Sequence, residues 1–306
     1  MSKSESASSP LDKDQLRCLM KRSDALGLVK IFQHGMVILV AVILLSSFDN
    51  WIMQGLTIIV LGGLLTFLFA PLHETIHKTA FKSPRLNAVV GWISGLVLVL
   101  PPKYFQAFHL AHHRYTQIPG KDPELDFGLD FGLDSEKPKT TGQYLRNLSG
   151  VDYWIGQVKA LVLFAMGNHH THFVSDVKQT GIVREARIFL VIYLLLLSLS
   201  LLGESAVLWK YWVLPMLIGQ PFLRAFLLAE HALCPLVPDM LRNTRTTLTN
   251  KLMRWVCWNM SFHVEHHAYP AIPFHQLPDA HRLLKPHISI ISNGYIAVNK
   301  EVLLSL

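Results

Sequence analysis

The stretch WIMQGLTIIVLGGLLTFLFAPLHETIH, residues 51–77, decides how this chain can fold. Residues 51–72 carry no charged side chain, and about 20 apolar residues are enough for a helix to cross a bilayer. The stretch ends in His73-Glu74-Thr75-Ile76-His77, where two histidines four residues apart would lie on one helix face. Because imidazole is the commonest metal-binding side chain, the segment predicts a membrane span that ends at a metal site.

Further histidines follow the same pattern. Residues 109–113 read HLAHH, residues 263–267 read HVEHH, and His231 stands alone after another apolar stretch. Chance would scatter the sixteen histidines of the chain rather than group them in this way. So many imidazoles directed to one place indicate more than one metal ion. The expected ligands are His73, His77, His109, His112, His113, His231, His263, His266 and His267.

Composition also indicates a membrane protein. Hydrophobic residues make up 51% of the chain and charged residues only 16%, whereas a soluble domain carries about a quarter charged residues. Four apolar stretches, at residues 31–47, 51–72, 187–202 and 206–229, are about long enough to span a bilayer. The expected fold is an all-α membrane protein, four transmembrane helices with a cytoplasmic helical cap that holds a histidine-rich dimetal site. We expect residues 1–30 to form a cytoplasmic segment and residues 31–306 a single membrane domain.

Two shorter apolar runs are expected to be interfacial or re-entrant. Residues 88–100 end at Pro101-Pro102, which cannot continue a helix, and residues 155–167 carry Lys159 near their centre. The turns at residues 47–50 and 203–205 contain no Lys or Arg. The positive-inside rule therefore places both termini and all nine histidines in the cytoplasm, with a bacterial inner membrane as the expected location. The net charge of +7 expresses this rule, so no nucleic-acid partner is expected.

Two other kinds of protein remain open at this point. His73-Glu74-Thr75-Ile76-His77 matches HExxH, in which two histidines bind zinc and Glu74 would be the general base of a membrane metallohydrolase. That interpretation leaves most of the other histidines unexplained. A metal-binding membrane protein without catalytic activity is the second alternative.

The three histidine boxes together resemble those of the membrane fatty acid desaturase and hydroxylase superfamily. The sequences around the boxes also resemble those of this superfamily, in FHLAHHRYT at residues 108–116 and WNMSFHVEHHAYP at residues 258–270. The similarity runs from about Pro71 to His281 and is closest to a bacterial branch that includes rhizopine oxygenase-like proteins. It implies a di-iron centre with O2 as co-substrate, held by the eight boxed histidines and by His231 as an extra ligand.

The resemblance implies O2-dependent desaturation or hydroxylation of an unactivated C–H bond in a lipid or hydrocarbon. A small polar substrate stays open, as in the rhizopine oxygenase-like branch. Some acyl desaturases have an asparagine one turn before the extra histidine, where this chain has Leu227, and this difference favours an oxygenase. No nucleotide-binding, iron–sulfur or haem motif is visible, so an external donor of ferredoxin, rubredoxin or cytochrome type with its reductase is expected.

Several residues outside the boxes are candidates for supporting roles. Metal-bound histidines usually donate their other N–H to a carboxylate or carbonyl group, and the candidates for this are Glu74, Asp122, Glu230, Asn259 and Glu265. The sequence leaves open whether His169, His170 or His172 contributes to the site. The repeat at residues 126–134 predicts a loop. The basic run at residues 242–251 fits either an acidic redox partner or anionic lipid headgroups.

Overall fold

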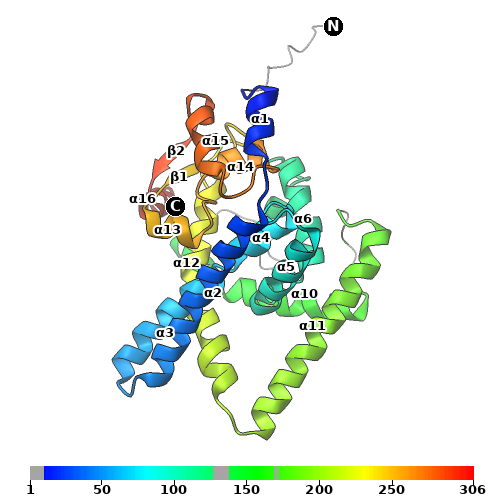
Figure 1. Cartoon of the computed structure of the whole chain (residues 1–306), viewed down its shortest axis with the longest axis vertical. Coiled ribbons are helices and arrows are strands. Elements are labelled where there is room, and N and C mark those ends of the chain that lie inside the picture. Colours follow the sequence, from blue (N-terminus) through cyan, green and yellow to red (C-terminus); the bar gives the residue numbers. More distant parts are fainter. Residues whose placement is uncertain (1–9, 127–137, 169–170, 172) are drawn as a thin grey trace.

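The structure is a computed structural model that describes residues 10–126, 138–168, 171 and 173–306. It is built almost entirely of helices, which confirms the predicted fold class (Figure 1). The sheet found in the described residues is a parallel pair of three-residue strands, β1 (Thr246–Leu248) and β2 (Ile291–Asn293). The helices are α1 (Lys13–Leu19), α2 (Asp24–Ser47), α3 (Trp51–Thr66), α4 (Phe69–Ile76), α5 (Pro84–Leu98), α6 (Pro102–Tyr115), α7 (Pro123–Asp126), α9 (Thr141–Ser149), α10 (Val151–Met166), α11 (Asp176–Leu202), the π-helix η1 (Trp209–Val213), α12 (Leu214–His231), α13 (Lys251–Val256), α14 (His263–Ala268), α15 (Leu277–Leu284), the 3₁₀ helix η2 (Lys285–His287) and α16 (Tyr295–Leu304).

Among the residues that the structure describes, four helical segments are long and apolar enough to cross a membrane, as the sequence predicts. They are α2, α3 with α4, α11, and η1 with α12. α2 and α11 begin well before the expected residues 31 and 187, because each apolar window is preceded by helical turns that also contain charged residues. The Ser23 hydroxyl caps α2 by accepting a hydrogen bond from the Leu26 N–H at 3.3 Å. The expected boundary at residue 30 therefore lies inside α2.

The proline pair ends an apolar run where the sequence predicts an end. α5 stops at Leu98, Val99 takes the left-handed conformation at φ 57°, and α6 begins at Pro102. The two helices meet at a bend of 96°, so together they form either a broken span or a re-entrant loop. The bend directs α6, which carries the second histidine box, across the end of α4.

The histidine-bearing elements lie together, away from the two short turns between spans. In Figure 1 the α2–α3 and α11–η1 turns lie at the lower end, and α13 to α16 form a cap at the upper end. His34 of α2 is buried and connects the spans to the cap. One of its ring nitrogens contacts the carbonyl of Leu64 at 2.9 Å, and the other contacts the indole N–H of Trp258 in the cap at 3.5 Å.

α3 and α12 pack closely because each has a glycine at the crossing. A Cβ added at Gly219 would lie 2.2 Å from the carbonyl oxygen of Gly62, and one added at Gly62 would lie 2.3 Å from that of Pro215. Small residues of this kind let transmembrane helices approach backbone to backbone. The contact fixes α3, which leads into the first histidine box, against α12, which ends at His231.

Replacing Gly219 with valine is expected to destabilise the protein strongly. Overpacking usually costs about 1–3 kcal/mol, and here the obstacle is backbone that cannot move aside, so we expect at least that cost. Thermal unfolding of purified protein in detergent measures the effect. Gly55→Val in α3 is the matched control because a Cβ there meets nothing within 4 Å. Equal unfolding temperatures for the two variants would contradict the close crossing.

Candidate metal centre

The nine predicted histidines come from four elements that end or cross at one place. His73 lies in α4 and His77 caps its C-terminus, while His109, His112 and His113 lie on the buried side of α6. His231 is the last residue of α12. The third box forms the short helix α14, and its histidines are all buried.

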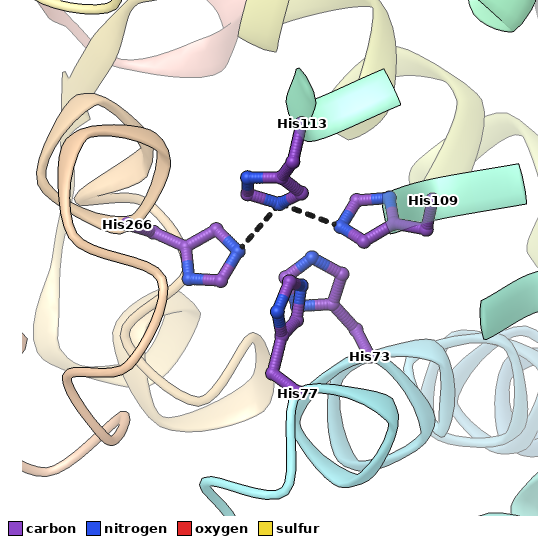
Figure 2. A group of neighbouring side chains, drawn as sticks. All are labelled: His73, His77, His109, His113 and His266. Carbon is purple, nitrogen blue, oxygen red and sulfur yellow. Dashed lines mark hydrogen bonds between the residues drawn. The ribbon is translucent and has the colours of Figure 1, made fainter. Parts of the chain in front are cut away.

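Five of these histidines form a first group, shown in Figure 2, with one ring nitrogen from each lying within 4.8 Å of the others. The rings of α4, α6 and α14 converge on a common centre. The Nε2 atom of His113 lies 2.9 Å from that of His109 and 3.1 Å from that of His266. The members of the first group are His73, His77, His109, His113 and His266.

A second group adjoins the first. His112, His231 and His267 bring one ring nitrogen each within 4.8 Å of one another. His263 lies beside this group, since its Nε2 is 3.2 Å from the Nε2 of His231 and its ring centroid is 4.4 Å from that of His267. The ring centroids of His113 and His267 are 4.1 Å apart, so the two groups are in direct contact.

The ring nitrogens of this cluster fit a cation better than they fit one another. A neutral imidazole nitrogen carries either one proton or one lone pair, so His113 Nε2 cannot satisfy both His109 and His266. The Nε2 atoms of His77 and His267 are buried and have no hydrogen-bond partner among the described residues. Burial, and then the neighbouring imidazoles, lower the pKa of His263, His266 and His267 well below the ordinary value, which keeps their lone pairs available. The donor set therefore fits two metal ions.

Two histidines of the second group are held by partners on the α6–α7 connection. The Nδ1 atom of His112 lies 2.9 Å from the Asp122 carboxylate, which also accepts hydrogen bonds from the N–H groups of Gln117 and Glu124. The Thr116 hydroxyl donates to the carbonyl of His112 at 2.7 Å, so it can accept from Nδ1 of His267 at 3.2 Å. Both contacts leave Nε2 free to bind a metal, as supporting partners usually do.

Of the other four candidates for supporting roles, one contacts a boxed histidine and three have other partners. Glu230 lies 3.2 Å from Nδ1 of His263, so it does contact a boxed histidine. Glu265 instead contacts Thr246 of β1 and His281 of α15, and so fixes α14 within the cap. Glu74 accepts from the N–H of Phe274, and Asn259 contacts Arg254 and Phe274. These contacts of Glu265, Glu74 and Asn259 involve no boxed histidine.

His231 is positioned by residues that the sequence did not reveal. The Gln117 side chain donates to the carbonyl of His231 at 3.0 Å, and Arg245 donates to the carbonyls of Ala229 and Ala232 at 2.8 and 2.7 Å. Thr116 and Gln117 lie three and four residues after the last histidine of the second box, and this proximity was the available signal. Arg245 and His281 carry no comparable signal, because neither stands next to a histidine box.

The structure buries the middle of the basic run at residues 242–251, so its charges do not form one continuous surface. Arg245 is buried, and residues 243–247 are buried with it because they include β1. Arg242 and Lys251 at its two ends are exposed. His169, His170 and His172, and the repeat apart from Asp126, lie outside the described residues.

Comparison with known proteins agrees with this site. The family model for fatty acid desaturases matches residues 49–295, a range that includes all nine histidines, and the chain belongs to this family. The protein is therefore a desaturase-like oxidoreductase of the membrane, as the resemblance of its boxes implied.

Relatives with different substrates in their names are similar to the chain at low identity. It is 26% identical to the dihydrorhizobitoxine desaturase of Bradyrhizobium elkanii over 245 residues, 76% of this chain and 68% of that protein. It is 24% identical to the sn-1 oleoyl-lipid 12-desaturase of Picosynechococcus sp. over 241 residues, 73% and 67% of the two chains. It is also 24% identical to a sphingolipid delta(4)-desaturase of Drosophila melanogaster over 233 residues, 73% and 64%.

Proposed function

We propose that the protein is an O2-dependent di-iron oxidase that desaturates or hydroxylates an unactivated C–H bond of a lipid or hydrocarbon. The observation that carries this proposal is the pair of adjoining histidine groups, which offers separate sets of nitrogen donors for two ions. His73, His77, His109, His113 and His266 would hold one iron, and His112, His231, His263 and His267 the other. Bound iron would supply activation of O2.

The electron balance requires a partner. Reduction of O2 to two water molecules takes four electrons, of which desaturation of the substrate supplies two. An external donor supplies the other two; in hydroxylation the donor likewise supplies two while one oxygen atom enters the product. We propose a ferredoxin, rubredoxin or cytochrome-type donor with its reductase, acting on the cytoplasmic side of a bacterial inner membrane.

The chain's own residues perform the positioning. Asp122 and Thr116 hold the rings of His112 and His267 so that one nitrogen of each faces the cluster. Phe105, Phe108 and Met260 line the cavity beside the histidines and make this part of its wall apolar. A water-poor wall protects a reactive site from side reactions.

A small polar substrate is the second candidate, as in the rhizopine oxygenase-like branch. The buried Arg224 lines the same cavity and would pair with a substrate carboxylate. Stimulation of O2 consumption by phospholipid vesicles supports the lipid substrate, and stimulation only by water-soluble carboxylates supports the alternative.

The zinc hydrolase is disfavoured because one HExxH zinc ion would leave the second histidine group without a role.

Metal content tests the proposal directly. We expect about two irons per chain, by mass spectrometry, in protein purified in detergent without chelator from iron-replete cells. O2 consumption with a chemical reductant should depend on that iron. One zinc per chain under the same conditions would contradict the di-iron site and favour the hydrolase.

A further inference from the structure

The cavity at the metal centre is too small for the substrate proposed above. Its volume is about 90 Å³, and a single water needs roughly 10–15 Å³. The cavity therefore has room for several waters and for a short section of a hydrocarbon chain. The rest of a lipid substrate must lie elsewhere.

A larger apolar groove lies where the spans meet the cap. Its volume is about 950 Å³, at the upper end of the roughly 300–1,000 Å³ usual for small-molecule sites. Its walls come from α2, α3 and α12 on the membrane side and from α13 and α16 on the cap side. The exposed Lys300 of α16 is also part of its lining, and would attract an anionic headgroup.

The side chains of Tyr144 and Asn299 in the groove are hydrogen-bonded within the protein. The Tyr144 hydroxyl donates to Asn299 at 3.1 Å, and the Asn299 amide donates to the carbonyl of Ala225 at 2.9 Å. These side chains do not require a polar ligand. The groove therefore suits an apolar chain.

The groove and the metal-centre cavity share two lining residues, Phe67 and Phe226. Both side chains are buried, and their rings meet edge to face with centroids 5.3 Å apart. Each phenylalanine lies between residues of its own segment that line the groove and residues that line the cavity. Gly63 lines the groove one turn before Phe67, and Ala70 lines the cavity after it.

The same order is found on α12. Phe222 lines the groove, Phe226 lines both spaces, and Glu230 lines the cavity. Residues four apart lie on one face of a helix, so this face runs continuously from the groove to the metal centre. The two phenylalanine rings form the partition between the two spaces.

We propose that the groove binds an acyl chain of a bilayer phospholipid, and that the Phe67–Phe226 pair is the partition through which the chain end reaches the metal centre. The groove is walled by membrane spans, so a chain enters sideways from the bilayer without crossing water. Reorientation of the two rings joins the two spaces. The second half of this inference rests on the proposed function, whereas lipid binding in the groove does not.

Photo-crosslinking tests occupancy of the groove without requiring turnover. Full-length protein in phosphatidylglycerol nanodiscs receives trace phosphatidylglycerol with a diazirine at one chain end, and peptide mass spectrometry locates the adducts. We expect adducts on Phe222 and Ala225, and a several-fold loss of them in Gly63→Phe, which fills the groove. Gly55→Phe on the same helix is the control and should keep wild-type labelling, because a Cβ at either glycine meets nothing within 4 Å.

Wild-type labelling of Phe222 in a folded, monodisperse Gly63→Phe protein overturns the groove as the binding site. Ala225→Phe fills the groove from the opposite wall and replaces Gly63→Phe if that variant does not fold. Either variant with lost labelling supports the proposal. An inactive protein with this labelling pattern would contradict the di-iron oxidase alone, and an active one without it would contradict the groove alone.

The partition is tested by the depth of labelling. Phe226→Ala should increase adducts on Met260 and Leu228, which line the cavity, whereas Phe226→Trp should reduce them. Phe67→Ala is the second opening variant if Phe226→Ala is unstable. Equal labelling of Met260 in folded opening and closing variants would overturn the partition.

Discussion

Replacing His112 with alanine is expected to abolish O2-dependent turnover and to lower the metal content from about two ions per chain to about one. His112 belongs to the second group, where His231, His263 and His267 are the described histidines that would remain to bind an ion. A metal that loses a ligand is bound more weakly, and oxidation of a C–H bond needs both ions in this proposal. Metal analysis and O2 consumption on the same preparation measure the two effects.

The comparison with Glu74→Gln separates this mechanism from the zinc hydrolase. A hydrolase would lose its general base in Glu74→Gln and keep its HExxH zinc in His112→Ala. In the di-iron oxidase, His112→Ala loses activity and Glu74→Gln keeps it. The amide of Glu74→Gln would still offer an oxygen to the N–H of Phe274, which Glu74 contacts at 3.2 Å. Turnover retained in His112→Ala with unchanged metal content would contradict the oxidase.

Replacing Asp122 with alanine is expected to weaken metal binding at the second group by about 10- to 100-fold, the usual effect of losing the partner of a metal-bound histidine. The carboxylate fixes His112 at 2.9 Å and also accepts from the N–H groups of Gln117 and Glu124. Its removal frees the ring and loosens the turn that carries it. Titration with Fe²⁺ under anaerobic conditions measures the affinity.

Asp122→Asn is the graded control for this prediction. The amide keeps the shape of the side chain and one acceptor oxygen, so its loss of affinity should be smaller than that of Asp122→Ala. Equal affinities in all three proteins would show that Asp122 does not position His112. Loss of the metal at the first group in either variant would show general unfolding instead.

Much of the fold and the site follows from patterns that are local in sequence. Four apolar windows predict four spans, and i, i+3 and i+4 spacing places the boxed histidines on common faces. Helical turns that contain charged residues interrupt the apolar pattern, so the starts of α2 and α11 lie earlier than the apolar windows predict. Histidines gather at one place because the spans return to the same end, which the charge pattern indicates.

Contacts between distant segments could not be predicted in this way. Arg245 looks like an exposed cation in a basic run, but the structure buries it against the last turn of α12. His281 has no box around it and yet contacts Glu265. The partition between groove and cavity requires Phe67 and Phe226 to meet across two spans. Such pairs depend on tertiary packing, which a single sequence does not display.

The glycine crossing of α3 and α12 links the position of His231 to the tilt of these helices in the bilayer. His231 lies twelve residues beyond Gly219, about 18 Å along the helix. A tilt of only about 5° at the crossing would therefore move His231 by about 1.5 Å, far more than the roughly 0.2 Å tolerated in a metal–ligand distance. Membrane thickness and lateral pressure act on the tilt of such helices. If the proposed di-iron site is occupied, the spacing of its two ions, and with it the rate of oxidation, should therefore respond to the lipid composition around the protein.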